Sequence, residues 1–131
     1  MRSLIKQSVI LPAPAEILYA TYMDPAKHAE MTGTPVMISA ESGSEFRAFN
    51  GQLSGTMLAA IPSRLVIQSW RSRHFGEGDP DSTLILAFAP EGGGGRIDLV
   101  HIDVPAQDHE GVTQGWETHY WEPWRRYLAG R

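Results

Sequence analysis

The chain has 131 residues and is 42% hydrophobic, and chains below about 150 residues rarely divide, so residues 1–131 are expected to form a single domain. Eleven Lys and Arg against 15 Asp and Glu leave a net charge of −4, which disfavours nucleic acid as a partner. There is no cysteine, and no apolar run suits a signal peptide or a membrane span, so a cytoplasmic protein with no membrane partner is expected.

The first quarter of the chain predicts one strand and two short helices. Residues 3–11 are rich in Leu, Ile and Val and predict a strand that ends before Pro12. Pro14 suits the first turn of a helix, which is predicted over residues 14–22. Asp24 before Pro25 repeats this pattern of a cap followed by proline, so a second short helix is expected before Gly33.

The middle of the chain predicts six antiparallel strands in a meander. Apolar runs alternate with turn segments, which places the strands at residues 36–40, 45–49, 53–60, 64–72, 82–89 and 96–104. The strongest hairpin signal is Asn50-Gly51, because a type I′ turn needs positive φ at both central residues.

A final helix is predicted over residues 109–129, with Asp108 as its N-cap. When this helix is projected at 100° per residue, its large apolar side chains form one stripe. Trp121 falls on the flank of that stripe and is expected to be partly exposed. Gly111 and Gly115 each lower helix stability by about 1 kcal/mol relative to Ala, and Pro123 removes a backbone hydrogen bond. Tertiary packing must therefore hold this helix. The stripe consists of Val112, Trp116, Tyr120, Pro123, Trp124 and Tyr127.

This order of elements indicates an α+β helix-grip fold. In that fold a seven-stranded antiparallel sheet curves around a long C-terminal helix, with two short helices after the first strand. Strand alternation places one side chain in two on the face toward the helix. The residues expected on that face are Leu84, Leu86, Phe88, Ile97, Leu99 and His101.

Two interpretations of this interior stay open. In the first, a small hydrophobic ligand lies between sheet and helix, and His101 anchors its polar group. In the second, the aromatic stripe is plain core, and His101 is satisfied by the backbone or by a neighbour such as Asp103. The cavity candidates under the first interpretation are Leu86, Phe88, Leu99, His101, Trp116, Tyr120 and Trp124.

One local cluster of basic and aromatic residues comprises Trp70, Arg71, Arg73 and His74. It is either a solvated strand end or a surface for a partner, and the candidates for that surface are Trp70, Arg71, Arg73 and Trp121. The sequence lacks a nucleophile elbow, a zinc-binding helix motif, a Walker lysine and a dinucleotide fingerprint. No catalytic residue, metal site or cofactor is therefore expected.

Several segments carry a family resemblance: residues 13–16, 24–25, 43–46, 50–51, 62–71 and 81–84, together with Gly55, His101, Pro105 and residues 115–123. Over nearly its whole length the chain resembles the helix-grip START-like (SRPBCC) superfamily. Within it, the chain is most similar to the C-terminal-domain family of the activator of the 90 kDa heat-shock protein (Hsp90) ATPase.

The resemblance implies a non-catalytic, co-chaperone-like domain with an Hsp90-type chaperone as its partner. Alternatively, it implies a carrier or sensor of a small hydrophobic ligand held between the sheet and the C-terminal helix. A third reading, from the breadth of the superfamily alone, is an aromatase- or cyclase-like enzyme that uses His101 as acid or base.

Overall fold

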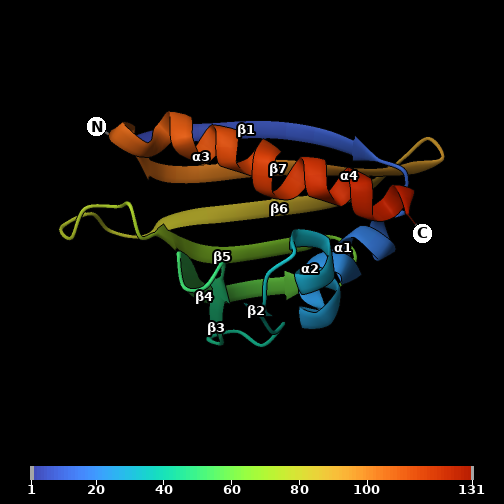
Figure 1. The fold of residues 1–131 in the computed structure, drawn as a ribbon, viewed down its shortest axis with the longest axis horizontal. Coiled ribbons are helices and arrows are strands. Elements are labelled where there is room, and N and C mark those ends of the chain that lie inside the picture. The colour runs from blue at the N-terminus through green and yellow to red at the C-terminus, as the bar shows by residue number, and fades with distance from the viewer. Residues whose placement is uncertain (1, 131) are drawn as a thin grey trace.

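Seven strands form one antiparallel sheet in the computed structural model, which describes residues 2–130 (Figure 1). Their order across the sheet is β1-β7-β6-β5-β4-β3-β2, so the first strand lies beside the last. The C-terminal helical segments run across one face of this sheet (Figure 1), and the predicted helix-grip fold is confirmed. The strands are β1 (Arg2–Leu11), β2 (Val36–Met37), β3 (Glu45–Ala48), β4 (Leu53–Ile61), β5 (Leu65–Ser72), β6 (Ser82–Glu91) and β7 (Gly94–Pro105).

Two short helices follow β1, as predicted: α1 (Ala15–Met23) and α2 (Pro25–Thr32). The side chain of Asp24 caps α2, because its carboxylate accepts hydrogen bonds from the backbone N–H groups of Ala26 and Lys27 at 2.9 and 3.1 Å. Gly33 ends α2 with φ of +88°. The two helices pack near the end of the C-terminal helix (Figure 1).

The second strand is shorter than predicted. Pairing in β2 covers two residues, whereas the apolar pattern indicated a strand over residues 36–40. After it, the hydroxyl of Ser44 donates to the carbonyls of Ser39 and Glu41. Such local side-chain bonds offer the backbone an alternative to a strand ladder, so the chain turns here instead of extending.

The hairpin between β3 and β4 has the predicted turn. Asn50 and Gly51 have φ of 57° and 83°, and the N–H of Gln52 bonds to the carbonyl of Phe49 at 3.1 Å. Phe49 also has a positive φ, 53°, so β3 ends one residue earlier than expected. This bend takes Phe49 out of the strand and toward the C-terminal helix.

The predicted last helix forms in three parts: α3 (His109–Trp116), the π-helical turn η2 (Glu117–Trp121) and α4 (Glu122–Ala129), all after the 3₁₀ turn η1 (Ala106–Asp108). In η2 the N–H of Glu122 reaches back five residues, to the carbonyl of Glu117. The widened turn lies immediately before Pro123, where an α-helix would bring the proline ring against the carbonyl of His119.

The core lies between this helix and the inner face of the sheet. Every second residue is buried there over residues 82–88 of β6 and 95–101 of β7, which confirms the alternation predicted from the sequence. The fully or almost fully buried side chains of this layer include Leu84, Leu86, Phe88, Ile97, Leu99 and His101 from the sheet and Trp116, Tyr120, Trp124 and Leu128 from the helix.

Candidate functional site

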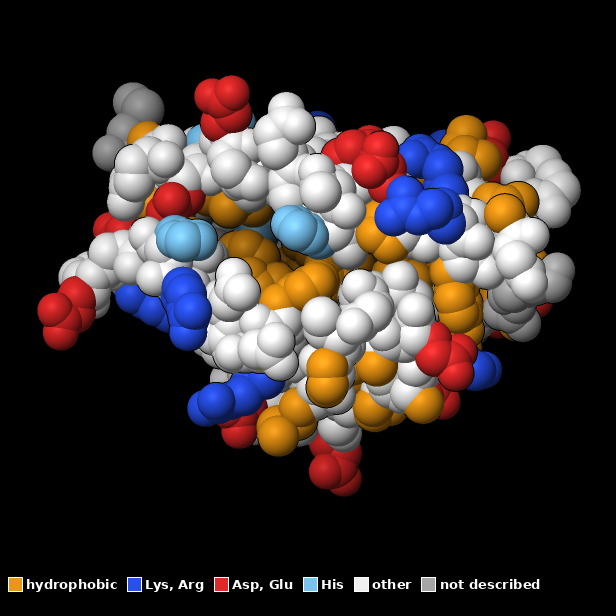
Figure 2. Space-filling model, in the orientation of Figure 1, with side chains coloured by type: hydrophobic (Ala, Val, Ile, Leu, Met, Phe, Trp, Pro, Cys, Tyr) orange, Lys and Arg blue, Asp and Glu red, His pale blue; other side chains and the backbone are white. Residues whose placement is uncertain are grey.

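A pocket of about 370 Å³ opens between the C-terminal helix and the ends of β4 and β5. Figure 2 shows this side of the molecule, where a hollow with a hydrophobic floor is bordered by histidine side chains. The volume lies within the range of small-molecule sites. The lining residues are Phe49, Gln52, Leu53, Trp70, Ser72, His74, Asp108, Gly111, Val112, Gly115, Trp116, His119 and Tyr120.

The pocket lies nearer the surface than the cavity predicted from the sequence. Of its seven candidates, Trp116 and Tyr120 line the pocket. The other five lie outside the lining and are buried in the hydrophobic core. These five residues are Leu86, Phe88, Leu99, His101 and Trp124.

Aromatic rings form a continuous wall on one side of the pocket. The centroids of Trp70 and Trp116 are 6.2 Å apart, and those of Trp116 and Tyr120 are 4.9 Å apart. Phe49 then follows at 5.9 Å from Tyr120 and 5.5 Å from His119. These spacings are typical of stacked and edge-to-face aromatic pairs, so the rings brace one another.

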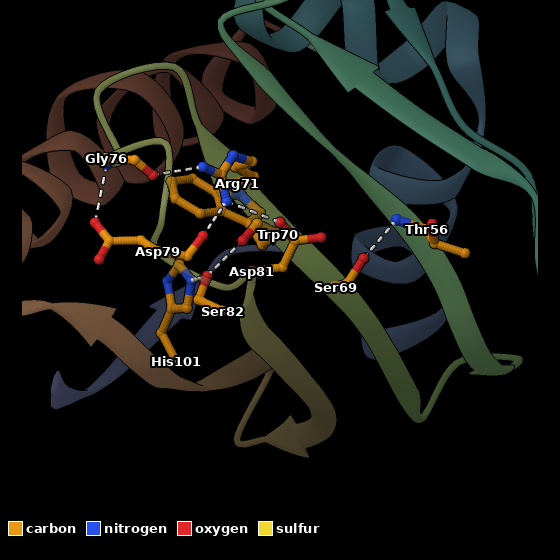
Figure 3. Close-up of polar contacts among 9 residues, drawn as sticks. All are labelled: Thr56, Ser69, Trp70, Arg71, Gly76, Asp79, Asp81, Ser82 and His101. Atoms are coloured by element: carbon orange, nitrogen blue, oxygen red, sulfur yellow. Dashed lines mark hydrogen bonds and ion pairs between the residues drawn. The ribbon is translucent and has the colours of Figure 1, made fainter.

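His101 is fully buried behind this wall and is fully hydrogen-bonded. Its Nδ1 accepts from the indole N–H of Trp116 at 3.2 Å. Its Nε2 lies 2.9 Å from the hydroxyl of Ser82 (Figure 3). That hydroxyl donates to the carbonyl of Trp70, so it must accept from a protonated Nε2. Burial lowers the pKa of His101 to about 3.

These contacts decide between the readings of His101. The imidazole is a neutral core group, as in the second interpretation, but its partners are Ser82 and Trp116. It lies outside the pocket lining and both its nitrogens are engaged in hydrogen bonds, so this geometry gives no support to His101 as a ligand anchor or as an acid or base.

A second buried histidine, His28 of α2, was not singled out from the sequence. Its Nδ1–H donates to the carbonyl of Tyr22 at 2.8 Å, and its Nε2 accepts from the hydroxyl of Tyr120 at 2.9 Å. Burial lowers the pKa of His28 to about 4. The burial of His28 and Met31 on one face of α2 follows helical spacing, which was the signal in the sequence that could have placed it in the core.

The two histidines have the same effect on the pocket. His101 takes the N–H of Trp116, and His28 takes the hydroxyl of Tyr120. The polar atoms of both pocket aromatics are therefore already paired, and these two side chains offer a ligand ring surface alone.

Two helical glycines keep the pocket open. A Cβ built on Gly111 would meet nothing within 4 Å among the described residues, and one built on Gly115 would meet Cδ2 of His119 at 3.9 Å. Both residues lie within α3, one turn apart, beside the pocket. Their effect on helix stability was recognised from the sequence, but their position beside a void was not, because periodicity places side chains and not the spaces between them.

Asp108 is the one carboxylate among the described lining residues, and none of those residues is Lys or Arg. Its Oδ2 is buried and has no hydrogen-bond partner among the described residues. The predicted N-cap bond is absent, because Asp108 ends η1 with ψ near 0° instead of taking the extended conformation of a capping residue.

Two of the four residues predicted for a partner surface are buried. Trp70 is 5% exposed and belongs to the pocket wall, and Trp121, predicted to be partly exposed, is 3% exposed. The widened π turn rotates Trp121 onto the buried side, where its indole N–H donates to Gln7 Oε1 at 2.7 Å. Trp121 stacks between Trp116 and Trp124 at 5.7 and 6.1 Å.

The two arginines of that predicted surface differ. Arg71 organises the loop between β5 and β6: its guanidinium donates to the carbonyls of Gly76 and Asp79 and pairs with the carboxylate of Asp81 at 3.2 Å (Figure 3). Arg73 is exposed on the same loop. The cluster is thus mainly a structural strand end, with Arg73 as its accessible cation.

A membrane-spanning helix and a cluster of metal ligands are both absent from residues 2–130. No helix in this range has the length and apolar character needed to span a membrane. No three His, Asp or Glu side chains in it converge as a set of metal ligands.

A curved antiparallel sheet that grips a C-terminal helix and leaves a pocket at its open end defines a START-like, helix-grip protein. The chain belongs to the family described as Activator of Hsp90 ATPase homolog 1-like protein, whose model matches residues 12–129.

Relatives of this family are similar to the chain at low sequence identity. The human activator of 90 kDa heat shock protein ATPase homolog 1 is 26% identical over 116 residues, which are 88% of this chain and 34% of that protein. The chain therefore spans about a third of the length of that relative. Among solved structures, an HSP90 activator from Plasmodium falciparum has a TM-score of 0.87 at 18% identity and covers 96% of both chains. CalU16 from Micromonospora echinospora has a TM-score of 0.71 at 26% identity, over 97% of this chain and 73% of that one.

Proposed function

We propose that this domain works by binding, and that the pocket beside α3 receives a small, largely apolar ligand. The apolar rings of such a ligand would displace water from the aromatic wall. This burial of apolar surface favours binding. Because the buried histidines hold Trp116 and Tyr120 in place, little ordering of the wall would accompany binding.

The observation that carries this proposal is the pair Gly111 and Gly115. Each lowers helix stability by about 1 kcal/mol relative to Ala. Neither has a positive φ, and no neighbour within the described residues would obstruct a Cβ at either position. The backbone and the packing do not require glycine here, and the space in front of both residues is the pocket, so we attribute their presence to ligand access.

A nitrogen-15 NMR titration with 2-naphthalenemethanol tests this proposal. We expect shifts confined to the amides around the pocket. Gly115→Leu fills the space beside the helix and should abolish the shifts, whereas Gln114→Leu places the same side chain on an exposed position outside the lining and should leave them unchanged. Absence of saturable shifts in the unmodified protein, or equal binding by both variants, would overturn the proposal.

A second candidate function is a co-chaperone-like interaction with an Hsp90-type chaperone in the cytoplasm. It is favoured by membership of the activator family and by the names of the human and Plasmodium relatives. On this reading the exposed Arg73 and the loop that Arg71 holds are the contact candidates.

The chaperone candidate is tested by titrating the labelled domain with the Hsp90 homologue of its own source. We expect binding tighter than about 100 μM, which corresponds to roughly −5.5 kcal/mol, with shifts in the β5–β6 loop. Arg73→Glu should weaken that binding. A saturating amount of chaperone without any shift would count against this function and leave the pocket as the working site.

A further inference from the structure

The charges around the pocket distinguish between ligand classes. Among the described lining residues Asp108 carries a full negative charge, and none carries the side chain of Lys or Arg. The whole chain has a net charge of −4. A carboxylate or phosphate on a ligand would meet repulsion from Asp108 with no Lys or Arg in the described lining to offset it, whereas a cation would be attracted.

The placement of Asp108 is unusual for a carboxylate. Its Oδ2 is buried with no hydrogen-bond partner among the described residues, although a buried, unpaired polar atom destabilises a fold by about 1–3 kcal/mol or more. The N-terminus of α3 contributes a partial positive charge of about +0.5, which is smaller than the full charge of the carboxylate, so this end of the pocket stays negative. A hydrogen-bond donor carried by a ligand would supply the missing partner.

The aromatic wall also favours a ligand that carries a positive charge. The faces of indole and phenol rings attract cations, and Trp70, Trp116 and Tyr120 stand together on one side of the pocket with the polar atoms of Trp116 and Tyr120 already engaged. An ammonium group near Asp108 would lie one helical turn from Gly111 and two from Gly115 along α3. The apolar part of the molecule could then pass over the two glycines.

We propose that the ligand is an organic amine: a flat apolar body that lies along α3 against the aromatic wall, with a protonated amino group at Asp108. This inference rests on the proposed function and adds the class of ligand to it. Gln52, Ser72, His74 and His119 also line the pocket, and they offer hydrogen-bonding groups that a secondary polar substituent could use.

Three probes with the same ring system test the charge of the ligand. They are 2-(aminomethyl)naphthalene, 2-naphthalenemethanol and 2-naphthoate, which are a cation, a neutral alcohol and an anion at neutral pH. We expect the amine to bind at least about tenfold more tightly than the alcohol, and the carboxylate to bind most weakly. Asp108→Asn should remove the preference for the amine, whereas Glu110→Gln, an exposed acid of the same helix outside the lining, should preserve it.

The outcomes separate this inference from the proposed function. If the three probes bind the pocket with equal affinity, or if Asp108→Asn keeps the preference for the amine, the amine proposal is wrong while ligand binding at the pocket stands. If none of the probes shifts the pocket amides, both fail. Circular dichroism and melting of each variant show that it is folded before its affinity is compared.

Discussion

The two buried histidines show how single residues fix the pocket wall. His28 and His101 come from opposite sides of the core, and each accepts a hydrogen bond from a pocket aromatic. Acceptance requires a neutral imidazole nitrogen, and burial secures it by lowering the pKa of each ring to about 4 and about 3. Protonation of either ring would break the bond to Tyr120 or Trp116.

The stability of the fold should therefore fall in acid. In the unfolded chain a histidine has a pKa near 6.5. As the pH falls below that value, the two histidines bind protons in the unfolded state but not in the folded state. Stability is thus fully present above about pH 6.5 and is lost toward the folded pKa values, by about 1.4 kcal/mol per pH unit for each histidine.

The substitution His101→Phe removes one of the two buried imidazoles, so it isolates the contribution of His101 to the pH dependence of stability. At pH 7 we expect a loss of about 1–3 kcal/mol of unfolding free energy, because the N–H of Trp116 loses its acceptor. Between about pH 6 and pH 4 the variant should lose about 1.4 kcal/mol less per pH unit than the unmodified protein. Urea denaturation across this pH range measures both effects, and equal slopes for the two proteins would refute a neutral, buried His101.

At the scale of elements, the C-terminal helix combines features that weaken an isolated helix. Its glycines face the pocket, and its π turn widens the helix immediately before Pro123. The extent of this helix could be predicted from periodicity. The π turn could not, because a projection at 100° per residue assumes regular spacing, and this assumption is the reason that Trp121 was expected at the surface.

Gly115→Ala should separate stability from binding. We expect the free energy of unfolding to rise by about 1 kcal/mol, since alanine is the better helix former and its Cβ meets open space. The affinity for 2-naphthalenemethanol should fall several-fold because that Cβ enters the pocket. Thermal melts and the NMR titration give the two readings, with Gln114→Ala as the control on the exposed face. A variant that is stabilised and binds equally well would contradict the role given to this glycine.

Gly55 of β4, in contrast to Gly115, has no room for a side chain. A Cβ built on it would lie 1.9 Å from the carbonyl oxygen of Ser69 in the next strand. Because that neighbour is backbone, Gly55→Ala must displace β4 from β5, and we expect a loss of about 3 kcal/mol or more. Gly78→Ala, whose Cβ would meet nothing within 4 Å among the described residues, is the matched control and should change the denaturation midpoint little.

For the molecule as a whole, most strands and both early helices could be predicted from the sequence, because turn, proline and capping residues mark where they begin and end. The inward face of the sheet followed from the period of two residues along each strand. The pocket could be predicted only in part. It lies where the helix, the Phe49 turn and the β5–β6 loop fail to close over the sheet, so its lining comes from segments that no local pattern relates. This tertiary arrangement, and no local sequence pattern, brings Asp108, Gly111 and His119 to the pocket.

The face of the sheet opposite the C-terminal helix, called the convex face here, offers another place where an apolar molecule could bind. Its larger exposed hydrophobic side chains include Leu4, Ile10 and Ile102, at 53%, 60% and 36% exposure. A small apolar probe could adhere there without entering the pocket. A test of the site must therefore report where the probe lies as well as whether it binds.

Intermolecular nuclear Overhauser effects from bound 2-naphthalenemethanol give that location directly. We predict contacts from the naphthalene protons to the rings of Trp116 and Tyr120 and to the α-protons of Gly111 and Gly115, all of which border the pocket. Contacts to Ile10 or other side chains of the convex face, with none to Trp116 or Tyr120, would show that the pocket beside α3 is not the binding site.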